Sequence, residues 1–234
     1  MRSLPSQPAS HVKPKTRRRL AFLGGFAVYF SVLWMLWETP LVYPLKIFVV
    51  LLHELSHAIA IWATGGSVDR IVLDPLQGGE TWGRGGSVFL SLSAGYLGSL
   101  LWGTALVTAA HWKKVHAGAI SGLIGASVVA LSIFYVRSGF GLVFGIIFGI
   151  SLMASGFRLP DLWNRRVVLV LGMTSCLYAV LDIKSDILDR PHLPSDAAML
   201  AEVTGIPTIF WGVLWIGLAL AVCTLLFRWA WRKA

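Results

Sequence analysis

Two histidines and a glutamate lie close together in the stretch LLHELSHAIAIWATGG, residues 51–66, whose other side chains are almost all apolar or small. His53 and His57 are four residues apart, so on a helix both imidazoles project from one face and can bind one zinc ion (Zn²⁺), with Glu54 beside the metal. A charged side chain near the centre of a membrane span costs at least ~2.5–3.5 kcal/mol on insertion scales, and such residues usually mark function. We therefore expect a zinc site here, and not histidines that only hydrogen-bond neighbouring helices.

A catalytic zinc site usually has three protein ligands and keeps one position for water, so a carboxylate must come from another part of the chain. Asp182 is the first choice, because a helix of about 20 residues that begins after Arg166 must continue to about Asp186 before it leaves the hydrocarbon. Asp186, one helical turn further on the same face, and Asp196, in the following loop, are the alternatives. The competing interpretation of Asp182 is an ordinary charge at a helix end.

The elements that must position these residues are membrane helices. Of the 234 residues, 56% are hydrophobic and only 13% are charged, which exceeds the apolar content of an ordinary soluble domain. Several uncharged runs approach or exceed the ~20 residues that cross a bilayer, and two further segments are interrupted by charge. The candidate spans are residues 20–37, 47–68, 87–110, 117–136, 138–157, 167–181 and 206–227. We expect an all-α, multi-pass membrane protein with about six to seven transmembrane helices.

A glycine-rich segment, residues 66–86, follows the HELSH helix. Its two halves flank a turn at Pro75, which predicts either a small re-entrant β-hairpin beside the site or a plain loop. A hairpin would offer a strand edge that could hold an extended peptide by main-chain pairing. Later in the chain, Ser195 can cap a short helix that Gly205 ends.

The sequence resembles the site-2-protease class of membrane zinc metallopeptidases, in its compact branch without a PDZ domain. Between about residues 45 and 215, the motifs that carry the resemblance are HELSH, GGSVDRIVLDPLQGGETWGRGG, AGYLGSLLWG, LDIKSDI and SDAAMLAEVTGIPTIFWGVLW. The resemblance implies zinc held by His53 and His57, Glu54 as the general base, and a bundle of membrane helices. Better-known members place the third ligand in an Asn-Pro and Asp-Gly setting, which neither Asp182 nor the only asparagine, Asn164, has here.

Basic residues gather at the amino terminus and near the ends of the expected spans. Residues 1–19 predict a disordered basic tail in the cytoplasm, residues 20–228 a transmembrane peptidase-like domain, and residues 229–234 a short basic tail. The first apolar run is longer than a signal-peptide core and has no small-residue cleavage site, so we expect a retained anchor. The net charge of +9 is scattered along membrane edges, which favours contact with the lipid bilayer and argues against nucleic-acid binding.

These observations predict an intramembrane zinc endopeptidase that cleaves transmembrane protein substrates with metal-activated water. The alternative is a non-catalytic membrane protein of the same fold, which binds zinc or a partner protein. A metal transporter is disfavoured, because it would need ionisable residues along a path through several spans. Small residues recur every four positions in two spans and predict close helix packing, which could also support a homodimer. They are Gly95, Ser99 and Gly103 in one span, and Gly141, Gly145 and Gly149 in the other.

Overall fold

The computed structural model describes residues 14–37, 39–189 and 194–233. Six of the described helices are long and apolar enough to cross a membrane. Five of them are α2 (Tyr43–Ala63), α3 (Val88–Ala110), α4 (Ala117–Tyr135), α5 (Gly139–Arg158) and α8 (Thr208–Lys233). The sixth is the stretch Asp161–Ile187, which contains α6 (Asp161–Lys184) and continues into a short π-helix, η1 (Ser185–Asp189). The prediction of an all-α multi-pass membrane protein is confirmed.

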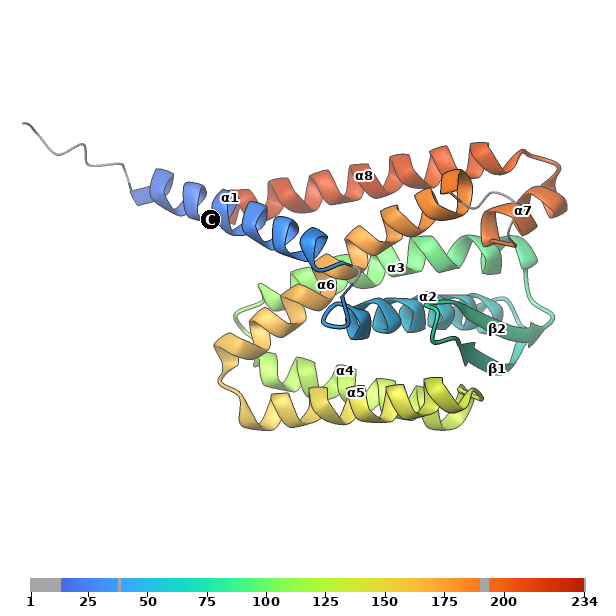
Figure 1. Ribbon diagram of the computed structural model, residues 1–234, viewed down its shortest axis with the longest axis horizontal. Helices are drawn as coiled ribbons and strands as arrows, with labels where there is room; N and C mark the ends of the chain where they lie inside the picture. Colours follow the sequence, from blue (N-terminus) through green and yellow to red (C-terminus); the bar gives the residue numbers. More distant parts are fainter. Residues whose placement is uncertain (1–13, 38, 190–193, 234) are drawn as a thin grey trace, which may run out of the picture.

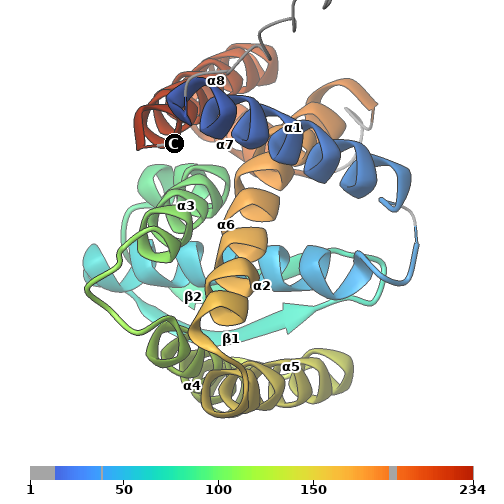
Figure 2. The ribbon, with the colours of Figure 1, turned by 90° about the vertical axis from the view of Figure 1, so that its left-hand side faces the viewer.

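The structure describes part of each predicted tail. Residues 1–13 of the expected amino-terminal tail lie outside the described residues, whereas residues 14–19 form the first turns of α1 (Pro14–Met35). Residues 229–233 are likewise the last turn of α8. Helix α1 is not one of the six candidate spans, and it lies beside the carboxyl-terminal part of α8 (Figures 1 and 2). Phe22 and Phe26 of α1 contact the ring of Phe227, with centroids 5.4 and 5.0 Å apart.

Helix α2 lies at the centre of the bundle, between the α4–α5 pair on one side and α3, α8 and α1 on the other (Figure 2). It contacts α3, α6 and both strands, and Ile47, Phe48 and Val49 are fully buried. Helix α6 crosses the bundle diagonally and contacts α2, α3, α4 and α8 (Figure 1). The HELSH motif is therefore held on the most enclosed helix of the described bundle, where its side chains are surrounded by other elements.

The two stripes of small residues pack within the chain. A Cβ added to Gly149 of α5 would lie 2.7 Å from the Gly125 carbonyl oxygen of α4, and one added to Gly103 of α3 would lie 2.8 Å from the Gly172 carbonyl oxygen of α6. Glycine is needed at these positions because the helix backbones approach so closely. The packing interpretation is confirmed, because both faces contact neighbouring helices of the same chain. A homodimer stays a prediction.

A β-hairpin follows α2, which confirms the hairpin and excludes the plain loop. Strand β1 (Ser67–Leu73) pairs antiparallel with β2 (Gly79–Arg84), and the register places Ile71 opposite Thr81. The far edge of β1 is held by the connection between α4 and α5, because the Arg137 backbone N–H donates to the Ile71 carbonyl at 2.9 Å. Strand β2 is therefore the open edge of the two-stranded sheet that the structure describes, and it lies next to α2.

Candidate metal centre

Two imidazoles from α2 converge on one carboxylate from α7 (Asp196–Thr204). The Nε2 atoms of His53 and His57 lie 3.0 and 3.2 Å from Asp196 Oδ2. Asp196 is the first residue of α7, and the side chain of Ser195 caps that helix by accepting a hydrogen bond from the Ala198 backbone N–H. These three side chains form the one group in the described part of the chain whose possible ligand atoms all lie within 4.8 Å of one another.

The contacts of the two Nδ1 atoms show how each imidazole ring is oriented toward Asp196. His57 Nδ1 lies 2.8 Å from the Ser91 carbonyl oxygen, which can only accept, so Nδ1 carries the proton and the Nε2 lone pair faces Asp196. His53 Nδ1 faces Asp182 Oδ2 at 3.9 Å. His53 Nε2 can donate its own proton to Asp196 Oδ2 at 3.0 Å. The unprotonated Nε2 of a neutral His57 and the same oxygen are both acceptors, so their contact of 3.2 Å indicates a cation between them, either a proton or a metal. The donor set fits zinc, which binds imidazole nitrogen and carboxylate oxygen.

The environment of Asp196 favours the ionised form that a metal ligand needs. Burial raises the pKa of the carboxyl, but the attraction of His57 and His53, when these rings are protonated, and their hydrogen bonds outweigh this effect and hold the pKa below its ordinary value. Metal ligands of this type bind in the deprotonated form. The carboxylate therefore needs no proton loss before it can bind a cation.

The structure places Asp182 and Asp186 beside the ligand group and not in it. Asp182 faces the outer nitrogen of the His53 ring, and Asp186 accepts a hydrogen bond from the Tyr96 hydroxyl. The Tyr96 ring in turn packs edge-on against His53, with centroids 5.1 Å apart. Asp196, which sequence reasoning ranked behind Asp182, is the carboxylate that meets both Nε2 atoms, and its helix α7 packs on α3.

Glu54 faces the hairpin. It is only 4% exposed, and the Thr81 hydroxyl of β2 lies 2.7 Å from its Oε2 and 3.0 Å from its backbone oxygen. A Cβ on Gly79 would lie 2.6 Å from Glu54 Oε1, so glycine allows the strand to approach the carboxylate. Residues two apart on a strand share a face, which is how Gly79 and Thr81 both reach Glu54.

A family model described as Peptidase M50B-like matches residues 26–226, which include the six candidate spans almost entirely and every residue of the candidate metal centre. The chain belongs to the Peptidase M50B-like family. No curated protein and no solved structure matches it. Family membership confirms the resemblance to membrane metallopeptidases that the HELSH motif and the later motifs indicated.

Sequence reasoning missed several residues that surround the ligand group of this M50B-like chain. Gly95 was assigned to helix packing alone, yet a Cβ there would overlap His53 Nε2 and lie 2.6 Å from Asp196 Oδ2. Thr81 and Tyr96 were not singled out. Their positions in the sequence could have indicated a role, since Thr81 lies in the segment expected to form the hairpin and Tyr96 lies in the AGYLGSLLWG motif.

A cavity of about 720 Å³ extends from the side chains of His53, His57 and Asp196 to the hairpin. Its wall includes His53, His57 and Asp196 together with Glu54 and Thr81. The turn that joins the strands also lines it. The cavity therefore has room for a peptide segment beside the group that could hold a metal.

Proposed function

We propose that this protein is an intramembrane zinc endopeptidase that cleaves transmembrane protein substrates. The observation that carries the proposal is the convergence of two imidazole nitrogens and one carboxylate oxygen beside Glu54, in the wall of a cavity within a helix bundle. Membership in a peptidase family supports a membrane metallopeptidase. The zinc requirement and the type of substrate belong to the proposal.

His53, His57 and Asp196 are the proposed ligands. Once bound, the ion would polarise the scissile carbonyl and make a bound water more acidic. Asp182 would orient His53 through its outer ring nitrogen, in the way that carboxylates commonly orient metal-binding histidines. This division of roles explains why two aspartates lie near His53 although one suffices as a ligand.

Glu54 is the proposed general base. Its carboxylate is held by the Thr81 hydroxyl on one side, and Gly79 leaves space on the other. It would accept a proton from the attacking water and deliver it to the nitrogen of the leaving amine, so that the water adds across the broken peptide bond.

Strand β2 is the proposed platform for the substrate. A transmembrane helix hides its peptide groups in internal hydrogen bonds, so a substrate must unwind before water can attack it. An unwound segment that pairs with the open edge of β2 would lie beside Glu54, because Thr81 and Gly79 of that strand already contact the glutamate. The hairpin would thus align the peptide bond as well as position the base.

The distribution of charge supports a cytoplasmic amino terminus. The start of α1 and the end of α8 lie at one end of the molecule, together with the α3–α4 and α5–α6 connections (Figure 1). These segments carry most of the described lysines and arginines, whereas the hairpin end carries fewer, namely Arg70, Arg84, Arg137 and Lys184. Basic residues near short loops favour the cytoplasmic side. Labelling of single cysteines at residues 113 and 76 in sealed membranes would test this orientation.

The experiment that tests the function compares wild type with Glu54→Gln for cleavage of a panel of single-span membrane proteins. The variant keeps the size of the side chain but cannot take the proton, so cleavage should fall by roughly 10²–10⁴-fold while zinc content is unchanged. Equal cleavage by both proteins would contradict the assignment. Zinc in both proteins without Glu54-dependent cleavage would favour a non-catalytic binding protein.

A further inference from the structure

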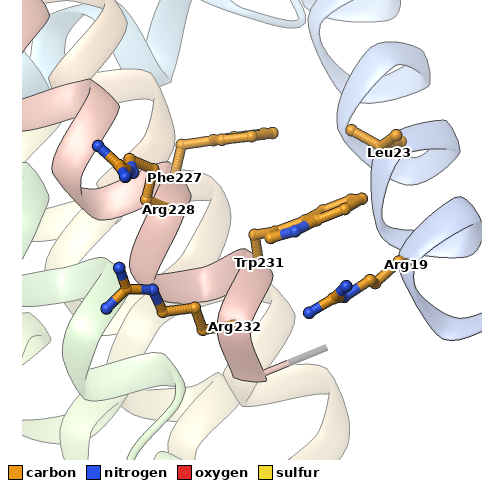
Figure 3. A pocket seen from close by; sticks show the side chains of 6 residues that line it. All are labelled: Arg19, Leu23, Phe227, Arg228, Trp231 and Arg232. Atoms are coloured by element: carbon orange, nitrogen blue, oxygen red, sulfur yellow. The ribbon is translucent and has the colours of Figure 1, made fainter. Parts of the chain in front are cut away.

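A second cavity, of about 540 Å³, lies between α1 and the end of α8. It is at the opposite end of the molecule from the hairpin and α7 (Figure 1). We call it the terminal groove. Its lining residues are Arg19, Leu23, Phe227, Arg228, Trp231 and Arg232, so it combines three guanidinium groups with three apolar side chains and has no acidic member (Figure 3).

The arginines of the terminal groove have no acidic partner within the described residues. Arg19 stacks over the Trp231 ring, with its guanidinium carbon 5.2 Å from the ring centroid, and its buried Nε makes no hydrogen bond in the described structure. A cation–π contact does not use the N–H donors, and leaving a buried donor unpaired is unfavourable. Arg228 and Arg232 are four residues apart, so they occupy neighbouring positions on one face of α8. Figure 3 shows the guanidinium groups of Arg228 and Arg232 directed away from α1, so Arg19 is the arginine that lies beside the apolar side chains of the groove. Its unpaired Nε is a donor that an anion could use.

The apolar part of the groove points to the kind of anion. Figure 3 shows Phe227 and Trp231 reaching from α8 toward α1, where Leu23 and Arg19 face them. Leu23 lies one turn further along α1 than Arg19, and Phe227 precedes Trp231 by one turn of α8, so the apolar wall continues from the arginines along both helices. A free phosphate would satisfy the arginines but leave this wall without a partner. An acyl chain attached to the phosphate would cover it.

We propose that the terminal groove binds the headgroup phosphate of an anionic phospholipid, with its acyl chain against Leu23, Phe227 and Trp231. Guanidinium groups bind phosphate oxygens through paired N–H donors, and tryptophan is favoured at the headgroup level. The proposal does not depend on the peptidase activity, since the groove contains none of the residues of the metal centre.

The test measures lipid binding to the purified full-length chain by native mass spectrometry, with phosphatidylglycerol and with phosphatidylcholine. The variants are Arg19→Gln and the double variant Arg228→Gln with Arg232→Gln. The matched control is Lys113→Gln with Lys114→Gln, which removes two exposed charges outside the groove. A basic residue near a membrane contributes about fivefold to the affinity for an anionic lipid, so we expect a roughly fivefold loss in Arg19→Gln. We expect a smaller loss in the double arginine variant, because both of its guanidinium groups point away from α1.

The supporting result is selective binding of phosphatidylglycerol over phosphatidylcholine, with the loss confined to the groove variants. An equal loss in the lysine control would overturn the proposal, because general surface charge would then explain the binding. Displacement of the lipid by millimolar inorganic phosphate would also overturn it and indicate a free-phosphate site. Arg19→Lys keeps the charge and should retain most of the affinity, so a folding defect of Arg19→Gln cannot be mistaken for support.

Discussion

Replacing Gly95 with alanine tests the metal centre with one methyl group. The added Cβ would overlap His53 Nε2 and lie 2.6 Å from Asp196 Oδ2, whereas ordinary contact begins at 3.4 Å. The aspartate oxygen and the methyl must therefore separate by about 0.8 Å. Ligand distances in metal sites vary by only about 0.2 Å, so the displaced ligands should no longer meet on one ion. Mutating residues that only orient metal ligands already weakens metal affinity by about 10–100-fold. Because Gly95→Ala would displace the ligands themselves, we expect at least a roughly 100-fold loss of zinc affinity.

The assay is competition for zinc between the detergent-solubilised protein and a chromophoric chelator. Gly122→Ala is the matched control, because Gly122 is also in a membrane helix and an added Cβ there would meet nothing within 4 Å. Alanine is favoured over glycine in helices by up to ~1 kcal/mol, so neither substitution should unfold its helix through propensity alone. Equal zinc affinity in the two variants would refute the reasoning, since the ligand atoms could not then lie where the structure places them.

Three further outcomes follow from contacts near the site. Thr81→Val removes the hydroxyl that donates to Glu54. A hydrogen bond to a charged group contributes ~1.5–3 kcal/mol, so turnover should fall roughly 10- to 100-fold at unchanged zinc content. Thr81→Ser keeps the hydroxyl and should retain activity. Asp182→Asn should weaken zinc binding about 10–100-fold without abolishing it, as measured by the same chelator competition. Asn164→Ala should lower the free energy of unfolding by about 1–3 kcal/mol in a denaturant titration, because the fully buried amide donates to the Ser155 and Leu159 carbonyls.

Local patterns predicted much of this molecule. Hydropathy located the six candidate spans, because a bilayer imposes a minimum apolar length on each helix. It also predicted a span at residues 20–37, where the structure has α1, a helix that is not among the six. The histidine spacing in HELSH predicted that His53 and His57 share a face of α2, as they do. The capping residues Ser195 and Gly205 predicted α7, whose end has the left-handed conformation at Gly205, with φ of 71°.

The carboxylate that meets the two histidines could not be identified in the same way. The span-length argument placed Asp182 within the membrane, and the structure places it near the outer nitrogen of the His53 ring. Which aspartate meets the two Nε2 atoms depends on how α7 packs on α3, a contact between segments far apart in the chain. Asp196 is separated from His53 by 143 positions, and the residue pattern within one helix does not indicate contacts between segments so far apart in the chain. The roles of Gly95 and Thr81 depend on the same long-range packing.

The most direct test of the central claim is the zinc content of the purified chain in detergent, measured for wild type, Asp196→Ala and Asp182→Ala. The proposal predicts one zinc per wild-type chain, none in Asp196→Ala, and retained zinc with weaker affinity in Asp182→Ala. A folded wild type that takes up no zinc after reloading would contradict a zinc peptidase. Loss of zinc in Asp182→Ala with full retention in Asp196→Ala would contradict the ligand set of His53, His57 and Asp196.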